Sequence, residues 1–597
     1  MSDEHSPRLP LPEHTGSTTS DSSNPSHDLS RRGQVSSDES STVSRIDSSD
    51  RWRFGGPGPL PQWPLVYDYH PGFEIPYHLS NSAIEIATQH ARELPYSLIQ
   101  VVCEHTEGEI PKREDLTLHI RGDLSNPLHT QWLNMLDTLI QVLLGMGWFG
   151  RIEVIDNRVT GIESFPPKLP QPAIASWESL VSGIIQQLET HQLPPVLVFP
   201  MNRGYWEDIS VPTVIARVQK RNAPASTMNR VSKLLSDFVQ DYGLQFELTG
   251  DDGLWGLFGT SGSQPLPGLA IESGTLGWPF NRGYNTMGMS VARKDVPDWS
   301  GTIGGYLTYN NRVLGITCHH VVRRGVHEQV DHDIDTTGGI DLPWVCQSPS
   351  TTDVETIETQ LSGQIPPPMP SNIPTALIAN RQRRAQETAT KLEQVERYSV
   401  GLGNVVATSG WRNVPYKVQL GPEPPLEMIM DWAMVDMTPS HWTESANVIQ
   451  DVAGDLAYDM NPVSSHWKCQ DVIVPTVAKQ INTGETLFKR GRSTGLTTGE
   501  CIRVAPASLR ILGIPQRLHH RCFIVAPYAG RKFAATGDSG SWCLNGKGEV
   551  VGILIGGDPT GSGLVIPMDL VIENMEAFLK LPSGSLKLLG SHQDEQV

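Results

Sequence analysis

The sequence predicts a multidomain α+β protein in which an α/β region precedes an all-β region of the barrel or sandwich type. Three observations predict this class. The chain has 597 residues, more than one hydrophobic core usually holds. Amphipathic helix patterns alternate with strand-like runs up to about residue 250. After residue 297 the pattern changes to short strands separated by Gly, Pro and Asn.

The N-terminal segment, residues 1–58, is rich in Ser, Asp, Arg, Gly and Pro and has almost no apolar periodicity. Such a composition cannot bury enough apolar surface to offset the entropy lost on ordering. We expect a disordered tail, with order beginning near W-P-L-V-Y at 63–67.

The next region, residues 59–250, carries the helix patterns of an α/β accessory domain. Two apolar helix faces have the same spacing, and each lies between two strand-like runs. The runs at 116–120 and 151–155 flank the first helix, and those at 213–218 and 244–248 flank the second. A third face follows Ser176, a candidate N-cap. The apolar residues of the three faces are Trp132, Met135, Leu136, Leu139, Ile140 and Leu143; Val231, Leu234, Leu235, Phe238, Val239 and Tyr242; and Trp177, Leu180, Val181, Ile184, Ile185 and Leu188. This pattern fits a β-α-β repeat, and two unrelated amphipathic helices would fit it equally well. We find no catalytic motif in this region.

Composition also divides the rest of the chain. Residues 251–297 are rich in Gly, Pro, Ser and Thr, which predicts a flexible connector that lets the accessory domain move. The all-β region then spans 298–579, and 580–597 form a C-terminal tail.

The overall charge and the cysteine content restrict the function and location. The formal net charge of −19 argues against nucleic acid or an anionic membrane as the main partner. No apolar run approaches the length that spans a bilayer, and the polar N-terminus does not resemble a secretory signal. The seven scattered cysteines form no C-x-x-C pair, which indicates reduced thiols and no zinc site. We expect an intracellular protein, cytoplasmic or nuclear and not secreted.

The stretch T-G-D-S-G-S-W-C at 536–543 contains a candidate nucleophile, Ser539. A serine hydroxyl needs a base, a group that orients the base, and N–H donors for the oxyanion. Gly537 leaves room for the turn, so the N–H groups of Gly537 and Ser539 can point toward one oxyanion. By itself the tetrapeptide G-D-S-G is weak evidence, because plain loops contain it as well.

The candidate base lies at the end of the strand V-L-G-I-T, which follows an Asn-Asn-Arg turn. Two adjacent histidines cannot face the same side of an extended segment, so at most one of His319 and His320 is the base. The candidate orienting acid is Asp431, which interrupts the apolar run M-I-M-D-W-A-M-V-D-M. A buried carboxylate at this position needs a partner, and the Nδ1–H of a histidine would be one. Asp436 is the competing candidate, but it lies nearer the end of the strand, where a solvated carboxylate needs no partner.

Taken together, these motifs resemble the trypsin-like (chymotrypsin-fold) serine peptidases over about 298–579. T-C-H-H-V-V resembles the T-x-x-H-V of the intracellular, high-temperature-requirement type, which would make His320 the base. D-W-A-M-V resembles the motif around the catalytic aspartate, and T-G-D-S-G-S matches the nucleophile turn. F-K-R-G-R-S-T-G-L-T-T-G at 488–499 resembles a glycine-rich hairpin of the second barrel, and G-L-V-I-P-M-D-L-V at 563–571 resembles the strand and helix after the specificity pocket. The resemblance implies a double β-barrel with a catalytic triad of His320, Asp431 and Ser539.

The sequence departs from this family in three respects. Residues 348–398, a Pro-rich piece and then a charged helical run, form an insertion that can be a surface excursion or a lid or exosite. Secreted members of the family are switched on by a cleavage that frees an Ile or Val N-terminus, which then pairs with the aspartate before the serine. We find no basic-residue-then-I-V-G-G site before 302, so the partner of Asp538 stays open. The position where trypsin-type enzymes carry their selecting charge is Phe533. With Ile555, Gly556 and Gly557 opposite, this predicts a neutral pocket.

We therefore predict an intracellular serine endopeptidase that acts through an acyl-enzyme without a metal or organic cofactor. Its expected partners are a protein or peptide substrate and a regulatory protein that binds the N-terminal domain, with neither nucleic acid nor membrane involved. The alternatives are a catalytically silent trypsin-fold scaffold and a partner-sensing protein.

Overall fold

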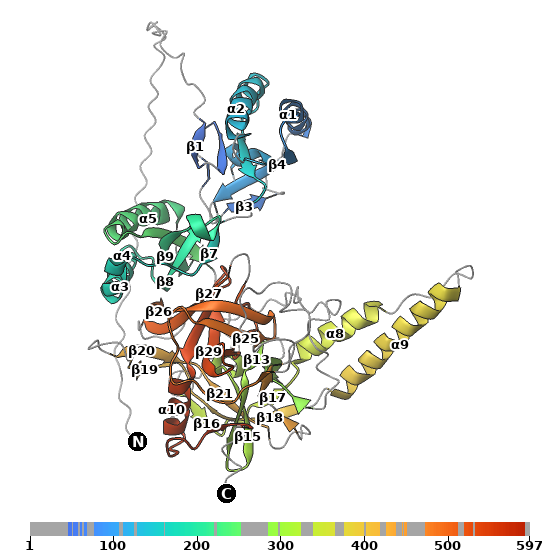
Figure 1. Cartoon of the computed structure of the whole chain (residues 1–597), viewed down its shortest axis with the longest axis vertical. Helices are drawn as coiled ribbons and strands as arrows, with labels where there is room; N and C mark the ends of the chain where they lie inside the picture. Colours follow the sequence, from blue (N-terminus) through green and yellow to red (C-terminus); the bar gives the residue numbers. More distant parts are fainter. Residues whose placement is uncertain are drawn as a thin grey trace, which may run out of the picture.

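The structure is a computed structural model that describes residues 46–590, apart from several gaps. The longest gaps are 69–76, 252–283, 324–337, 365–374, 418–424, 438–443, 450–471 and 511–518. Figure 1 shows an N-terminal unit (blue), a second unit (green) and the β-rich C-terminal part, from which a helical hairpin projects. Within the described ranges, no helix is long and apolar enough to cross a membrane.

The N-terminal unit is a six-stranded sheet with strand order β1-β2-β6-β5-β4-β3 and two helices. Strands β5 and β6 are parallel and α2 connects them, so this part is a β-α-β unit. All six apolar residues of the first predicted helix face are buried in α2. The elements are β1 (Asp47–Asp50), β2 (Arg53–Gly56), β3 (Leu65–Asp68), α1 (Tyr77–His90), β4 (Tyr96–Thr106), η1 (Arg113–Asp115), β5 (Leu116–Gly122), α2 (Leu128–Gly145) and β6 (Arg151–Asp156).

The end of the predicted tail belongs to this folded unit. Residues 47–50 form β1 and residues 53–56 form β2, and β2 pairs with β6. Phe54 is fully buried, and the Arg53 guanidinium pairs with the carboxylates of Glu104, at 3.0 Å, and Glu153. The prediction of disorder up to residue 58 is wrong for this stretch, because long-range strand pairing orders a segment that has no apolar periodicity. Residues 1–45 of the predicted tail lie outside the described residues.

The second unit also contains a β-α-β arrangement, since β9 and β10 are parallel and α5 connects them. The predicted face of α4 is fully buried. In α5, however, Leu234 is 40% exposed and the helix ends at Gln240, before Tyr242. Ser176 is the N-cap of α4 but makes no side-chain capping bond, because α3 ends directly before it. The elements are β7 (Glu163–Phe165), α3 (Gln171–Ala175), α4 (Trp177–Thr190), β8 (Pro195–Gly204), η2 (Glu207–Ile209), β9 (Val211–Gln219), α5 (Ala225–Gln240) and β10 (Gln245–Asp251).

This second unit is joined to the C-terminal part by a shared sheet. Strand β8 pairs with β26 (Gly495–Leu509) of the C-terminal part. The Trp177 indole donates to the Pro506 carbonyl at 2.9 Å, and Arg217 pairs with Asp558 at 3.0 Å, with both side chains almost fully buried. The expectation that a connector lets the whole accessory region move is therefore wrong for this unit, because its edge strand uses its backbone groups to extend the sheet.

The first half of the C-terminal part is a closed six-stranded β-barrel. Its pairings run from β12 to β13, which continues into β14 at Gly304, and then through β15, β21, β18 and β17 back to β12. The predicted Asn-Asn turn between β14 and β15 has positive φ at Asn310 (47°) and Asn311 (62°), as a two-residue hairpin loop requires. The strands are β12 (Met289–Arg293), β13 (Ser300–Ile303), β14 (Gly305–Tyr309), β15 (Arg312–Thr317), β17 (Val345–Gln347), β18 (Gly401–Thr408) and β21 (Ala433–Asp436).

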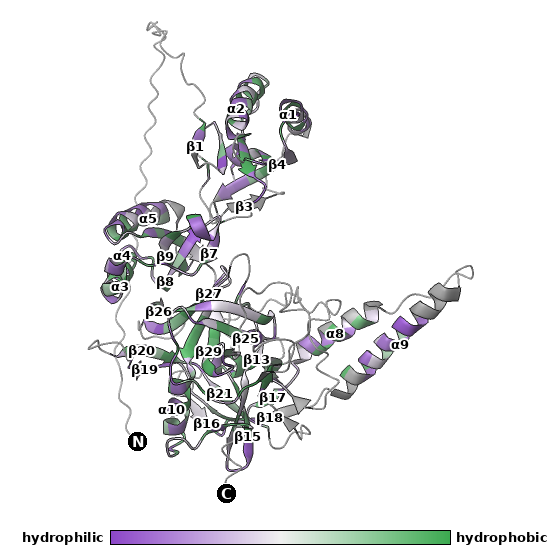
Figure 2. Ribbon diagram, viewed as in Figure 1, coloured by the Kyte–Doolittle hydropathy of each residue, from purple (hydrophilic) through white to green (hydrophobic). Residues whose placement is uncertain are grey.

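The second half forms another ring of six strands, in the order β25-β26-β27-β30-β29-β28 and back to β25. Figure 2 shows that barrel strands such as β29 are hydrophobic. The predicted double barrel is thus present. Besides β26, its elements are β25 (Thr486–Gly491), β27 (His520–Pro527), β28 (Trp542–Leu544), β29 (Val550–Gly557), β30 (Gly563–Pro567) and α10 (Met568–Phe578). A hairpin of β19 (Arg412–Tyr416) and β20 (Leu426–Met430) pairs with β27. Five further strands in the described C-terminal part have only two residues each: β11 (Tyr284–Asn285), β16 (Gly339–Ile340), β22 (Glu444–Ser445), β23 (Val448–Ile449) and β24 (Val472–Ile473).

Two boundaries of the barrel domain differ from the predicted ones. Strand β12 starts at Met289, inside the predicted connector, whose residues 252–283 are not among those described. The predicted C-terminal tail contributes β31 (Lys587–Leu588), which pairs with β14 and buries Leu588. Both segments are too short to show periodicity in the sequence.

The insertion between the barrel strands is a pair of helices, α8 (Thr351–Gln364) and α9 (Thr375–Tyr398). Figure 1 shows that they project from the barrels. A small separate core holds the pair together, formed by Val354, Ile357, Leu361 and Val395. The described part of α9 is mainly hydrophilic in Figure 2, as the charged helical run predicts.

Candidate active site

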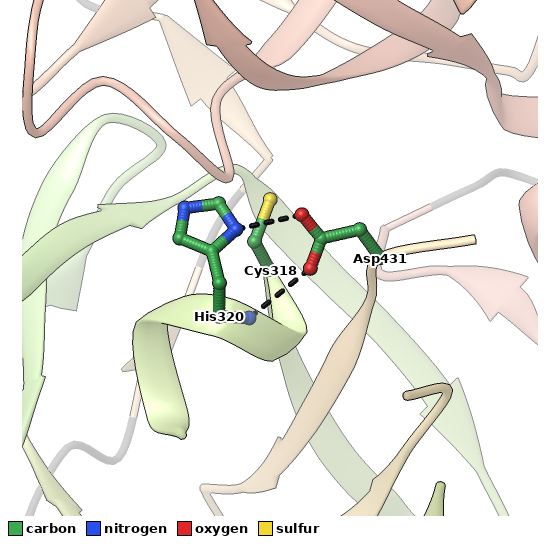
Figure 3. Close-up of side chains that lie close together, drawn as sticks. All are labelled: Cys318, His320 and Asp431. Carbon is green, nitrogen blue, oxygen red and sulfur yellow. Dashed lines mark hydrogen bonds and ion pairs between the residues drawn. The ribbon is translucent and has the colours of Figure 1, made fainter. Parts of the chain in front are cut away.

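His320 of the T-C-H-H-V-V motif and Asp431 of the D-W-A-M-V motif are hydrogen-bonded to each other, and both side chains are buried. His320 lies in α6 (His319–Val322), a single helical turn after the end of β15, and Asp431 lies between β20 and β21. The His320 ring Nδ1 is 2.6 Å from Asp431 Oδ2, and the His320 backbone N–H donates to Asp431 Oδ1 at 3.1 Å (Figure 3). Two bonds to the two oxygens of one carboxylate fix the orientation of the imidazole.

The electrostatics of this pair favour a charged carboxylate. Burial by itself would raise the pKa of Asp431, but attraction to His320 and the hydrogen bonds from it lower that pKa below its ordinary value of 3.8. At the other side of the ring, His320 Nε2 is buried and has no hydrogen-bond partner among the described residues. A ring held at Nδ1 with an unused Nε2 can accept a proton there.

The neighbouring histidine has a different environment. His319 Nδ1 is 2.6 Å from Thr408 Oγ1, and the ring meets Trp411 edge-on at 5.2 Å. The two histidines point to different places, as predicted, although the segment is helical and not extended. The other candidate acid, Asp436, pairs with Arg312 at 2.7 Å, and both side chains are partly exposed.

Ser539 lies in a turn whose backbone is hydrogen-bonded to Thr302 of the first barrel. Gly537 and Gly540 have positive φ values of 94° and 97°, which favour glycine. The Thr302 N–H donates to the Ser539 carbonyl and the Thr302 hydroxyl donates to the Gly537 carbonyl, each at 2.8 Å. A Cβ on Gly540 would collide with the Thr302 carbonyl. The turn therefore depends on both glycines and on Thr302.

The same bonds leave two backbone donors unused. The N–H groups of Asp538 and Gly540 donate to the carbonyls of Ala535 and Leu554. Those of Gly537 and Ser539 donate to no acceptor in the described part of the chain. The carbonyl of Thr536 is held by the Ser493 hydroxyl, so the N–H of Gly537 in the same trans peptide faces the opposite way. These two groups are the donors predicted for an oxyanion hole.

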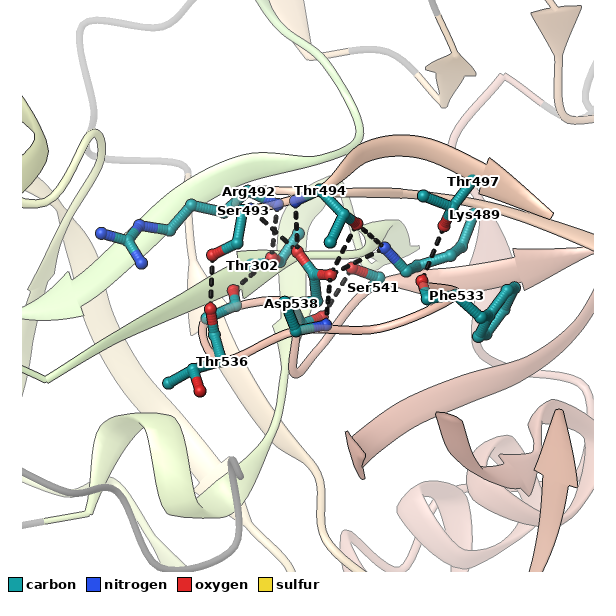
Figure 4. Close-up of polar contacts among 12 residues, drawn as sticks. Thr302, Lys489, Arg492, Ser493, Thr494, Thr497, Phe533, Thr536, Asp538 and Ser541 are labelled. Atoms are coloured by element: carbon teal, nitrogen blue, oxygen red, sulfur yellow. Dashed lines mark hydrogen bonds and ion pairs between the residues drawn. The ribbon is translucent and has the colours of Figure 1, made fainter. Parts of the chain in front are cut away.

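Asp538, whose partner the sequence left open, pairs with Lys489 in the β25–β26 hairpin (Figure 4). Lys489 Nζ is 2.8 Å from Asp538 Oδ2, and both side chains are fully buried. Thr494 Oγ1 and the N–H groups of Ser493 and Ala535 donate to the same carboxylate, at 2.7, 2.8 and 3.0 Å. Asp538 thus has an internal lysine as its partner, and its charge is neutralised without a new N-terminus. The sequence contained a signal for this, a lysine inside the apolar strand T-L-F-K-R-G.

Replacing Lys489 with methionine should destabilise the protein and disturb the nucleophile turn. The change leaves the buried Asp538 carboxylate without its counter-charge, which costs about 3–5 kcal/mol in the free energy of unfolding. Urea denaturation of full-length protein measures this loss, and we expect peptidase activity to fall with it. Lys547→Met, at an exposed position of the same barrel, should change neither property. Equal unfolding free energies for Lys489→Met and the wild type would contradict the prediction.

The four predicted pocket residues lie in the second barrel and are all buried. Phe533 is packed between two glycines, since a Cβ would lie 2.6 Å from its ring at Gly563 and 3.0 Å at Gly499. Ile555, Gly556 and Gly557 belong to β29, and Gly557 pairs with Gly563. None of the four carries a charge. The preference of the pocket for substrate side chains stays a prediction.

Cys318, His320 and Asp431 also form a cluster of possible metal ligands, with their ligand atoms within 4.8 Å of one another. Burial, and then the nearby Asp431 charge, raise the pKa of the Cys318 thiol well above its ordinary value, and this thiol donates to the Leu554 carbonyl at 3.3 Å. Metal ligation needs the thiolate. The Asp431 carboxylate and the His320 Nδ1 are already bonded to each other. This donor set therefore fits a histidine–carboxylate pair better than a metal site.

Known peptidases resemble part of this chain. The sequence model of peptidase family S64 matches residues 278–581, about half of the chain. Among solved structures, a glutamic acid-specific serine protease is 12% identical with a TM-score of 0.24, covering 51% of this chain and 100% of its own. A Nocardiopsis protease is 12% identical with a TM-score of 0.25, and Thermobifida fusca protease A is 11% identical with a TM-score of 0.24; each match covers 51% of this chain and 97% of the other. Among curated proteins, no sequence matches.

Proposed function

We propose that this chain, which belongs to peptidase family S64 and is a serine peptidase of the chymotrypsin fold, cleaves internal peptide bonds. It would do so through a catalytic triad of Ser539, His320 and Asp431. The observation that carries the proposal is the buried pair of His320 and Asp431, in which Nδ1 is bonded to the carboxylate and Nε2 has no partner among the described residues.

In this mechanism the Ser539 hydroxyl attacks the carbonyl carbon of the scissile peptide. His320 Nε2 accepts the hydroxyl proton and later donates it to the leaving amine. The charged Asp431 holds the proton of His320 on Nδ1 and stabilises the imidazolium that forms. A water molecule then hydrolyses the acyl-enzyme by the same route in reverse.

The nucleophile turn would supply the stabilisation of the transition state. The unused N–H groups of Gly537 and Ser539 are placed to donate to the oxyanion, and such donors act without reorganisation because the turn is already fixed. The buried pair of Lys489 and Asp538 supports this turn without any cleavage of the chain, so we propose that the active-site geometry forms on folding.

A fluorophosphonate probe tests the proposal directly. We expect full-length protein to be labelled covalently and Ser539→Ala to be unlabelled, because the probe reacts with an activated serine. Ser236→Ala, in helix α5 and remote from the nucleophile turn, should be labelled like the wild type. Absence of labelling in folded wild-type protein would favour a catalytically silent scaffold and overturn the proposal.

We also propose that the protein works in a reducing compartment inside the cell. Six described cysteines are free and buried, which fits reduced thiols. Its partners would be a protein or peptide substrate and a regulatory protein that binds the N-terminal unit.

A further inference from the structure

The inserted hairpin reaches the nucleophile turn through one ion pair. Asp353, in the first turn of α8, binds the guanidinium of Arg492: Nε donates to Oδ2 at 2.6 Å, and Nη2 donates to Oδ1. The side chains of Arg492 and Asp353 are only 10% and 5% exposed. Arg492 lies in the turn between β25 and β26, directly before the two residues whose N–H groups bind Asp538.

Arg492 also touches the residues that hold the turn in place (Figure 4). Its backbone N–H donates to the Thr302 hydroxyl at 3.0 Å, and this hydroxyl donates to the Gly537 carbonyl at 2.8 Å. Its guanidinium lies against Gly537, because a Cβ on that glycine would collide with Arg492 Nη1. Arg492 therefore contacts Gly537 directly and also through Thr302.

This ion pair is a poor device for stability alone. Removing two charges from water costs several kcal/mol per ion, and a well-packed apolar pair would often stabilise a fold as well or better. A two-pronged bond between a guanidinium and a carboxylate does fix the plane of the arginine. Here that plane is fixed against one of the two candidate oxyanion donors.

We propose that Asp353 and Arg492 are positioning residues for the oxyanion hole, so that the insertion 348–398 supports the active site through its first helical turn. Asp353 holds the guanidinium against Gly537, and the guanidinium in turn limits how far the Gly537 peptide can rotate. The inference rests on the proposed function, because it presupposes that Gly537 donates to the oxyanion.

Kinetics of full-length variants test this role. In Asp353→Asn and Arg492→Met we expect kcat to fall about 10- to 100-fold, because misplacing a catalytic group by about 1 Å has an effect of this size, whereas KM should change little. The double variant should be no slower than the slower single variant, since both substitutions break one interaction. Arg492→Lys keeps the positive charge but cannot make the two parallel hydrogen bonds to Asp353, so its kcat should also fall. If Asp353→Asn does not fold, this variant tests the positioning role instead. Glu355→Gln removes the same charge from an exposed position of the same helix and should behave like the wild type.

A pair of inhibitors separates positioning from stability. A peptide aldehyde forms a tetrahedral adduct with an oxyanion, and the matching peptide alcohol does not. The variants should bind the aldehyde more weakly by about the same factor as kcat falls, and the alcohol as the wild type does. A contrary outcome is a variant that has a lower melting temperature and still keeps the wild-type kcat and aldehyde affinity at temperatures below its unfolding transition. With Ser539→Ala inactive, that result would overturn the positioning role. Full activity of Ser539→Ala would instead overturn the proposed function itself.

Discussion

Ser539→Ala should abolish peptide hydrolysis, lowering kcat by about 10⁶-fold while the protein stays folded. The substitution removes one oxygen atom from a turn that the backbone bonds of Thr302, Asp538 and Gly540 already hold. An internally quenched peptide, cleaved between its fluorophore and quencher, measures the turnover, and thermal unfolding monitors the fold.

His320→Ala should lower kcat by a similar factor, and combining it with Ser539→Ala should add little, because the members of a triad act as one unit. His319→Ala is the matched control. Its ring bonds Thr408 and packs against Trp411, so its loss should affect stability more than turnover. An inactive His319→Ala beside an active His320→Ala would show that the base is assigned to the wrong histidine.

Asp431→Asn should lower kcat by about 10⁴-fold. An asparagine amide can donate to His320 Nδ1, and it then holds the proton on Nε2, the nitrogen that has to accept one. Asp436→Asn is the control, since it replaces the same residue type on the neighbouring strand, where the ion pair with Arg312 is partly exposed. It should change kcat no more than a few-fold. Equal losses in both variants would contradict the assignment of Asp431.

The pH dependence of stability follows from the direction of the Asp431 shift. A carboxyl whose pKa is lower in the folded than in the unfolded chain stabilises the fold fully above its ordinary value of 3.8. This contribution is lost as the pH falls through the lowered pKa. The difference in unfolding free energy between wild type and Asp431→Asn should therefore shrink in strong acid, as the pH falls below 3.8, and urea denaturation at a series of acidic pH values measures it.

Local sequence patterns were sufficient where one short segment carries the whole signal. The Asn-Asn turn, the apolar face of α2 and the glycines around Ser539 depend on dihedral angles and periodicities within a few residues. The resemblance of the motifs around His320, Asp431 and Ser539 to those of the trypsin-like peptidases then implied the double barrel. The sequence therefore determined the fold class of the C-terminal part and the residues to test as a triad.

The tertiary structure decided the features that depend on partners far away in the chain. β2 is ordered by pairing with β6 and β1 by pairing with β2, and the second unit is fixed by the pairing of β8 with β26. No local periodicity encodes these pairings. The same holds for charges. Lys489 and Asp538 are 49 residues apart in sequence, and Arg492 and Asp353 are 139 apart. A buried charge in a sequence indicates that some partner is needed, but only the folded chain determines which residue comes within hydrogen-bonding distance.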